Sequence, residues 1–161
     1  MQIRHVQAND LSTLIAIEKA GFSPAKAATP AAFKNRIANI SDTFLVATKQ
    51  DQVIGFVNGP VIAQLYLTDD LFTTTQANPT QGGYQSILGL AVAPAWQHQG
   101  VAQQLLKALA SQAQQQQRQA VTLTCEKRLI PFYEANGFRN HGQSASTHGD
   151  VVWYNMVQPL N

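Results

Sequence analysis

Three residues with chemically active side chains stand close together in the last third of the chain, namely Cys125, Glu126 and Tyr133. A phenol can donate a proton, a carboxylate can accept one, and a thiolate can attack an electrophile. No histidine–carboxylate pair stands beside Cys125, so a small core residue fits better than a nucleophile. Glu126 precedes Lys127 and Arg128, so an ion pair is as good an interpretation as a base. Tyr133 alone indicates an aromatic residue of a short helix packed on a sheet.

A second candidate is a glycine turn between an apolar segment and a helix, where Leu90-Ala91-Val92 precedes Gln97-His98-Gln99-Gly100-Val101-Ala102. The first N–H groups of a helix have no partners inside it and lie at the positive end of its dipole. Small residues at Gly100 and Ala102 would let an anionic group approach them. Glycine is common at such turns, so the pattern alone is weak. Neither G-x-x-x-x-G-K-[ST] nor G-x-G-x-x-G is present, which excludes a nucleoside-triphosphate P-loop and a dinucleotide-binding fold.

The elements that position these residues follow from apolar periodicity and turn residues. Helices are predicted at about 10–21, 30–40, 99–117 and 129–135. Strands are predicted at 3–6, 44–47, 53–57 with an extension to Tyr66, 84–93, 121–124 and 151–157. The polar segment from Leu67 to Gly83 is long enough to be functional or mobile. This order predicts an α/β domain whose helices pack on a central mixed sheet.

The composition limits the class of protein. A chain of 161 residues and 17.5 kDa with 45% hydrophobic residues fits one folded domain. Only 12% of the residues are charged and the net charge is +2 without a basic cluster, which disfavours a nucleic-acid partner. One cysteine excludes an internal disulfide, and four scattered histidines give no metal-site spacing. No apolar signal core or membrane-spanning stretch is present, so we expect a soluble, cytoplasmic monomer or homodimer.

Two segments resemble one known family. Gln97-x-x-Gly100-x-Ala102, directly after Leu90-Ala91-Val92, resembles motif A of the GCN5-related N-acetyltransferases (GNAT), Q/R-x-x-G-x-G/A. The segment Pro131-Phe132-Tyr133-Glu134-Ala135-Asn136-Gly137-Phe138 resembles the family's later F-Y-x-x-x-G-F segment, at the separation typical of the family. Within that family, the arylalkylamine (serotonin-type) branch is the most similar, on Leu90-Ala91-Val92, Cys125-Glu126, Pro131-Phe132-Tyr133, Ile17-Glu18, Gly21-Phe22 and the long loop after Tyr66.

The resemblance implies one acetyltransferase domain over residues 1–161. The implied fold is α/β (α+β), with a mixed, mostly antiparallel sheet of about six to seven strands that splays at the cofactor cleft, flanked by about four helices. Acetyl-coenzyme A is the implied co-substrate, and no metal is implied. Its pyrophosphate would be bound by backbone amides of His98, Gln99, Gly100, Val101, Ala102 and Gln103. Its pantetheine arm would pair with the backbone of Leu90, Ala91 and Val92.

The implied reaction is direct attack of a neutral amine on the thioester, assisted by proximity and by backbone N–H donors. The tyrosine of the F-Y segment is the family's acid, so the resemblance makes Tyr133 the general acid for the leaving thiolate. The animal arylalkylamine enzymes use two histidines on the strand that enters motif A, and those positions here are Ser86 and Leu88. The proton acceptor therefore stays open between a water held by Ser86, the carboxylates Glu126 and Glu18, and bulk water.

The acceptor is expected between the first two helices and the segment 67–83. Phe22, Phe33 and Phe72 could line its apolar wall, although Phe33 fits core packing as well. The expected function is N-acetylation of a primary amine of a small molecule, arylalkylamine-like or other. A peptide or protein amine is one alternative, which an open cleft without an aromatic wall would favour. A non-catalytic coenzyme A-binding module is the other, because the histidine pair is missing.

Overall fold

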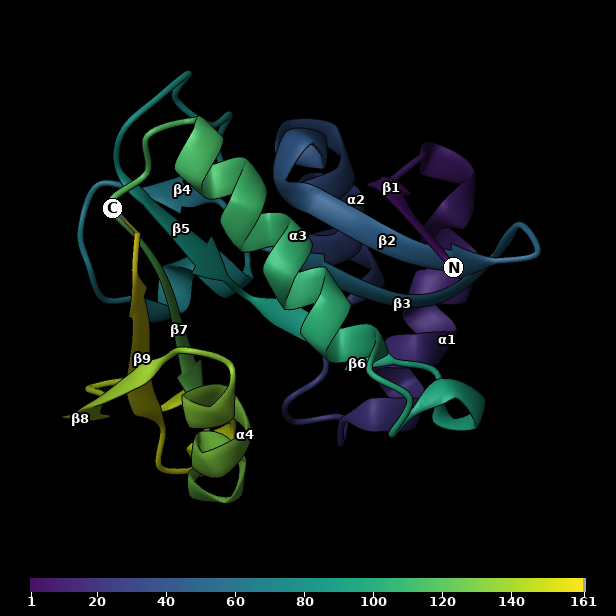
Figure 1. The fold of residues 1–161 in the computed structure, drawn as a ribbon. Coiled ribbons are helices and arrows are strands. Elements are labelled where there is room, and N and C mark those ends of the chain that lie inside the picture. Colours follow the sequence, from purple (N-terminus) through teal and green to yellow (C-terminus); the bar gives the residue numbers. More distant parts are fainter. Residues whose placement is uncertain (161) are drawn as a thin grey trace.

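The computed structural model describes residues 1–160, and this part of the chain contains nine strands and four α-helices (Figure 1). The helices are α1 (Leu11–Gly21), α2 (Pro30–Asn39), α3 (Val101–Gln115) and α4 (Ile130–Ala135). The strands are β1 (Gln2–His5), β2 (Phe44–Lys49), β3 (Gln52–Asn58), β4 (Val61–Ile62), β5 (Tyr84–Ile87), β6 (Gly89–Val92), β7 (Ala120–Cys125), β8 (Arg139–Gln143) and β9 (Tyr154–Pro159). The predicted α/β class and the four predicted helices are confirmed.

The strands form two sheets. One is antiparallel throughout, in the order β1-β2-β3-β6, and the other has the order β4-β5-β7-β9-β8. Within the second sheet only β5 and β7 run parallel. The sequence predicts one mixed sheet that splays at the cleft, and in the structure the strands divide there into two sheets. The strands β4 and β8 were not predicted as separate strands, so the number of strands exceeds the predicted six to seven.

The two sheets separate within the segment 84–93, which the sequence predicts as one strand. Leu88 interrupts it, and its N–H donates to the Asn58 carbonyl oxygen over 2.7 Å. Before the break, β5 pairs with β7 as far as Ile87 opposite Leu123. After the break, β6 pairs with β3, beginning with Gly89 opposite Asn58. Among the described strands, β6 has no partner on its other edge, so a wedge opens between β6 and the end of β7.

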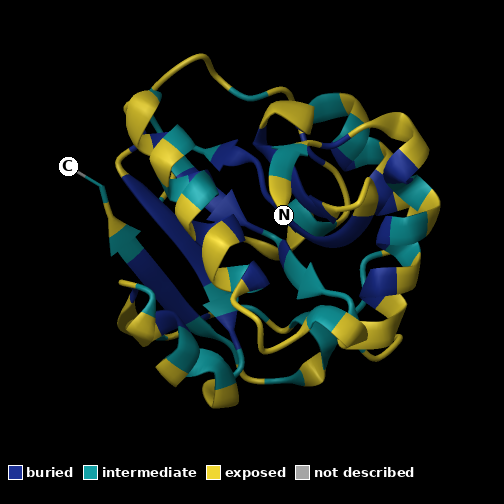
Figure 2. Cartoon of the chain, turned by 45° about the vertical axis from the view of Figure 1, so that its right-hand side comes forward, coloured by how far each residue is buried: buried dark blue, intermediate teal, exposed yellow. Residues whose placement is uncertain are grey.

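Helices pack on both faces of the four-stranded sheet. Alternate residues of a strand face opposite sides, so β2 supplies Leu45 to one face and Phe44 to the other. On the first face, α3 buries Leu105 and Leu109 and also reaches β7. On the second face, α1 and α2 bury a cluster around Phe33. Figure 2 shows buried residues concentrated in the strands and on the inner faces of these helices.

The predicted ends of two strands differ from the structure by several residues. β3 ends at Asn58 instead of extending to Tyr66, because Gly59-Pro60 follows and proline supplies no N–H to a ladder. The last strand, β9, lies at Tyr154–Pro159 instead of 151–157. The long segment 67–83 contains one 3₁₀ turn, Asp69–Phe72, called η3 below. None of the described helices has the length and apolar character needed to cross a bilayer.

Candidate active site

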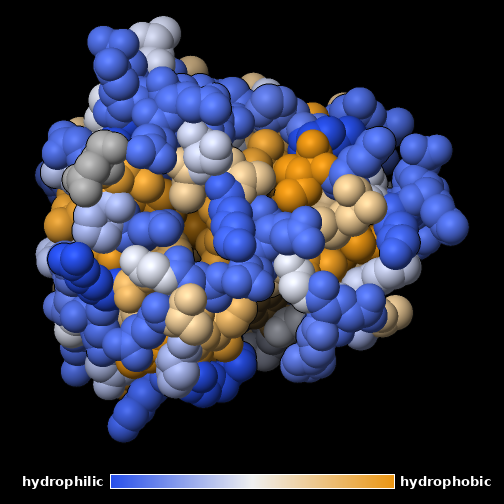
Figure 3. All heavy atoms as spheres, viewed as in Figure 1, coloured by the Kyte–Doolittle hydropathy of each residue, from blue (hydrophilic) through white to orange (hydrophobic). Residues whose placement is uncertain are grey.

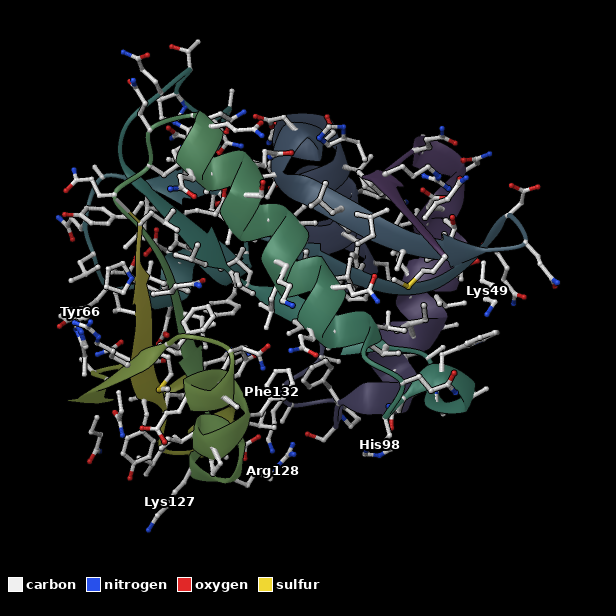
Figure 4. All side chains as sticks on the ribbon, in the orientation of Figure 1. Lys49, Tyr66, His98, Lys127, Arg128 and Phe132 are labelled. Atoms are coloured by element: carbon white, nitrogen blue, oxygen red, sulfur yellow. The ribbon has the colours of Figure 1, made fainter. Side chains whose placement is uncertain are left out.

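The turn between β6 and α3 presents backbone N–H groups at the surface. Gly100 is the N-cap residue of α3, has a φ of 84°, and no side chain caps the helix. A Cβ built on Gly100 would meet nothing within 4 Å, so the space in front of the first turn is open. His98 is exposed at this turn (Figure 4). The turn therefore forms a cradle that an anionic group can enter toward the positive end of the α3 dipole.

A groove of about 400 Å³, called the β6 groove below, joins this cradle to β6 and α4. Figure 3 shows the surface hollowed between α4 and the start of α3, and Figure 4 shows Phe132 and Arg128 on the α4 side. Gln99 does not line the groove, and its side-chain amide donates to the Ala95 carbonyl oxygen over 3.3 Å. The other residues predicted to bind the cofactor all line it: Leu90, Ala91, Val92, His98, Gly100, Val101, Ala102 and Gln103.

A second space of about 280 Å³, called the inner cavity below, adjoins the β6 groove. Its walls come from the helices α1, α2 and α4, from the strands β5, β6 and β7, and from the α1–α2 connection, η3 and the β8–β9 connection. Both spaces share the same five lining residues: Phe22, Leu90, Arg128, Leu129 and Tyr133. The two spaces therefore meet where β6 faces the Tyr133 side chain across the wedge between the sheets.

Tyr133 is the buried residue of α4 and only 7% exposed. Its ring packs edge-on against Phe132 and Phe138, with centroid separations of 5.1 and 5.5 Å. Burial, together with the nearby Cys125 thiol, raises the pKa of the Tyr133 phenol well above its ordinary value. The phenol therefore keeps its proton at neutral pH and can act as a donor to a group at the junction of the two spaces.

Glu126 lies at the rim of the inner cavity and is already paired. Lys26 Nζ donates to both of its oxygens at 3.3 and 3.2 Å, and Arg128 Nη2 stands 3.9 Å from Oε2. Of the two interpretations of Glu126, a base and an ion pair, these contacts agree with the ion pair. Beside it, burial is the main cause that raises the pKa of the Cys125 thiol to about 11, so the thiol stays protonated and is a poor nucleophile at neutral pH.

Glu18 and Arg36 are charged residues buried in the inner cavity, 5% and 2% exposed. Glu18 Oε2 accepts from the Ala28 N–H over 2.7 Å, whereas Oε1 has no hydrogen-bond partner. Burial raises the pKa of Glu18, opposed by the Ala28 N–H and by the charge of Arg36. A buried polar atom without a partner costs about 1–3 kcal/mol. Glu18 Oε1 is therefore a buried carboxylate oxygen without a hydrogen-bond partner, on a residue that lines the inner cavity.

Two predicted site residues lie elsewhere. Ser86 is fully buried and its hydroxyl donates to the Pro60 carbonyl oxygen over 2.6 Å, so it lines neither space and is not placed to hold a water there. Gly59 lets the chain approach this strand, because a Cβ there would overlap the Ser86 carbonyl. Phe33 is fully buried against Phe44 and Phe56, so it belongs to the core and not to the acceptor wall.

The inner cavity has an aromatic roof made of segments far apart in the sequence. Phe72 of η3 stacks on His148 with centroids 4.9 Å apart, and Trp153 lies 6.0 Å from the same imidazole. Asp69 connects η3 to the β8–β9 connection by two hydrogen bonds. Its carboxylate accepts from the Ser146 hydroxyl at 2.5 Å and from the Thr147 N–H at 3.2 Å. His148 Nε2 lies 3.4 Å from the Lys26 carbonyl oxygen of the α1–α2 connection.

Sequence reasoning predicted part of this roof. Phe22 and Phe72, the two residues predicted for the apolar acceptor wall besides Phe33, both line the inner cavity. Asp69 lies on the exposed turn η3, and its carboxylate accepts from the Ser146 hydroxyl. His148 and Trp153 were missed, because their glycine- and serine-rich surroundings carry no spacing pattern. Arg36 was also missed, although the sequence held a signal: it follows Phe33 by one helical turn and therefore shares its buried face.

The two splayed sheets, the open helix start and the buried phenol between two spaces together define an α/β domain of the acetyltransferase type. A family model described as the acetyltransferase (GNAT) domain matches residues 13–158, and the chain belongs to this family.

Solved structures share the fold at low identity. The GphF GNAT-like decarboxylase in complex with isobutyryl-CoA is 18% identical, with 100% of both chains covered and a TM-score of 0.85. The loading GNATL domain of CurA from Lyngbya majuscula is 15% identical, with 98% of this chain and 96% of that chain covered and a TM-score of 0.82. The ribosomal-protein-S18-alanine N-acetyltransferase from Escherichia coli is 18% identical, with 99% and 94% covered and a TM-score of 0.71. No curated protein matches the sequence.

Proposed function

We propose that residues 1–161 act as a single domain that transfers the acetyl group of acetyl-coenzyme A directly to a primary amine of a small molecule. The observation that carries the proposal is the meeting of the β6 groove and the inner cavity at Tyr133. One space is suited to the cofactor, the other to the acceptor, and a protonated phenol stands between them. Membership of the acetyltransferase family supports the reaction type.

The β6 groove fits coenzyme A on two observations. The open space at Gly100 lets a pyrophosphate reach the uncapped N–H groups of α3. The unpaired edge of β6 offers the backbone of Leu90 to Val92 to an extended pantetheine arm. Among the proteins of similar fold, the GphF enzyme binds isobutyryl-CoA and the NatB complex binds CoA, which agrees with this assignment. When bound, acetyl-coenzyme A supplies an activated acetyl group at the junction.

The chain's own residues would move the protons. Glu18 Oε1 accepts one proton from the acceptor ammonium, and the resulting amine forms its N–C bond as the thioester C–S bond breaks. Tyr133 donates its proton to the departing sulfur, and the second proton lost from nitrogen restores the phenol. Glu18 suits the first step better than Glu126, because Lys26 and Arg128 already pair with Glu126, and burial raises the pKa of Glu18.

The roof favours a small acceptor over a peptide. A peptide terminus needs a continuous groove for the residues behind the amine, whereas here three segments interlock above the inner cavity through Asp69 and His148. The aromatic wall of Phe22, Phe72 and Trp153 suits an arylalkyl group. The similar folds include the ribosomal-protein-S18-alanine N-acetyltransferase from Escherichia coli, so the peptide or protein acceptor is the alternative to test.

Release of free thiol from acetyl-coenzyme A tests the proposal, with arylalkylamines, amino acids, polyamines, amino sugars and peptides offered as acceptors. We expect turnover with at least one small amine and none with peptides. Turnover with peptides alone would contradict the small-molecule assignment. Absence of turnover with every acceptor, together with calorimetric binding of coenzyme A, would instead indicate the non-catalytic binding module.

A further inference from the structure

Two buried charges in the inner cavity lack part of their hydrogen-bonding complement. Glu18 Oε1 has no partner. Arg36 donates from Nη1 to Asn58 Oδ1 at 3.3 Å and from Nη2 to the Phe72 carbonyl oxygen at 3.1 Å, but its Nε–H has no partner. The two side chains are 5% and 2% exposed, and both line the cavity. They do not form a direct ion pair within the described part of the chain.

The other charged groups around the cavity already have partners. Glu126 is paired with Lys26 at 3.2 Å, and Asp69 accepts from the Ser146 hydroxyl. The lining as a whole holds three acidic and three basic side chains, Glu18, Asp69 and Glu126 against Lys26, Arg36 and Arg128. A site for a purely cationic amine would carry an excess of acidic groups. This balance suits a molecule that carries both signs of charge.

The two atoms without hydrogen-bond partners, Glu18 Oε1 and Arg36 Nε, require different partners. A carboxylate oxygen accepts, so Glu18 Oε1 is completed by an N–H of an ammonium group. A guanidinium nitrogen donates, so Arg36 Nε is completed by an oxygen of a carboxylate. Burial lowers the pKa of Arg36 to about 10, opposed by Glu18, so the guanidinium stays charged at neutral pH. Buried charges are stable only when paired and hydrogen-bonded, and a zwitterion would complete both at once.

We propose that the acceptor is an α-amino acid with an aromatic side chain. Its ammonium contacts Glu18 Oε1, its carboxylate contacts Arg36 Nε, and its ring lies against the aromatic roof of Phe72, His148 and Trp153. This assignment rests on the proposed acetyl transfer and names its substrate class. Arg36 acts as the residue that selects acceptors with a carboxylate beside the reacting amine.

Calorimetry on the protein saturated with coenzyme A tests the assignment without relying on turnover. Four compounds of similar size separate the two charges: L-phenylalanine, phenethylamine without the carboxylate, L-phenylalaninamide with a neutral amide, and 3-phenylpropanoate without the amine. We expect L-phenylalanine to bind at least about tenfold more tightly than each of the others, since each loses one charge-assisted contact. Equal or tighter binding of phenethylamine, or no binding of L-phenylalanine, overturns the proposal.

A matched pair of variants on α2 locates the carboxylate contact. Arg36→Gln is expected to weaken L-phenylalanine binding about 10–100-fold and phenethylamine binding by less than about threefold, since phenethylamine has no carboxylate. Lys34→Gln, which removes an exposed charge from the same helix, should change neither. Equal weakening of both compounds by Arg36→Gln would assign Arg36 a structural role only. If that variant does not fold, the four-compound series on the unaltered protein still decides.

Thiol release in the same samples separates this proposal from the proposed function. Selective L-phenylalanine binding without thiol release would leave the amino-acid site standing and contradict acetyl transfer. If phenethylamine releases thiol at least as fast as L-phenylalanine and L-phenylalanine does not bind more tightly, acetyl transfer stands and the amino-acid site is contradicted.

Discussion

Removing one oxygen from the protein tests the role of Tyr133. Tyr133→Phe keeps the ring and its edge-on contacts with Phe132 and Phe138. The free energy of unfolding should therefore change by no more than about 1 kcal/mol. Coenzyme A binding should be retained, because the cradle at Gly100 is formed by backbone groups. The variant thus removes the proton donor and little else.

The expected loss of kcat is about 10²–10⁴-fold, the usual contribution of a positioned proton donor. At 1.36 kcal/mol per tenfold change in rate, this is about 3–5 kcal/mol of transition-state stabilisation. The raised pKa of Tyr133 keeps the phenol protonated throughout the neutral range, so the unaltered enzyme should show no loss of this acid below about pH 10. The loss of kcat in Tyr133→Phe should become smaller above about pH 8.5, because an ordinary thiol then leaves as the thiolate and needs no proton.

The assay is thiol release in the steady state and in a single turnover, beside calorimetric binding of coenzyme A. The single turnover matters because slow product release would conceal a slower chemical step. Tyr84→Phe is the matched control, since this phenol bonds Gln119 at 3.2 Å and lines neither the β6 groove nor the inner cavity. A single-turnover rate within threefold of the unaltered enzyme would refute Tyr133 as the acid.

Three further predictions concern other parts of the molecule. Gly100→Glu should abolish coenzyme A binding measured by calorimetry, whereas Gly82→Glu, at a similar positive φ in open space, should cost comparable stability and leave binding intact. Phe33→Ala should lower the free energy of unfolding by about 3–5 kcal/mol in urea titration, whereas Phe72→Ala should mainly raise the KM of the acceptor. The hydrogen-bonded ion pair with Arg4 of β1 lowers the pKa of Asp10. Ionised Asp10 therefore stabilises the fold above the ordinary carboxyl range, and this contribution is lost as the pH falls through the lowered pKa. In Asp10→Asn, the free energy of unfolding measured by urea titration should depend less on pH over that acidic range.

Local patterns were sufficient to predict the glycine turn before α3 and the short helix that carries Tyr133. The periodicity of α3, the small residues at Gly100 and Ala102, and the position of Tyr133 on a short helix are all set within a few residues of sequence. Backbone groups form most of the cradle, so its location depends on the turn and not on distant side chains. The break at Leu88 could not be predicted in this way, because the run around it is continuously apolar and the break depends on pairing with Asn58 and with β7.

The inner cavity depends on contacts between distant segments. Ser86 lies on β5, one strand before the glycine turn, and its hydroxyl donates to the Pro60 carbonyl oxygen, which no local pattern reveals. His148 lies in a segment without periodicity and joins the site only through its stack on Phe72 and its approach to Lys26.

This division has a consequence for acceptor choice. A short motif can preserve the cofactor cradle, because its N–H groups are present whatever side chains surround them. The lining of the inner cavity, in contrast, consists largely of side chains, and η3, the α1–α2 connection and the β8–β9 connection each contribute some of them. A substitution in any of the three can change the charge or shape met by the acceptor while the fold and the cradle persist. The motifs therefore support the proposed acetyl donor, and the two buried charges Glu18 and Arg36 support the proposed acceptor.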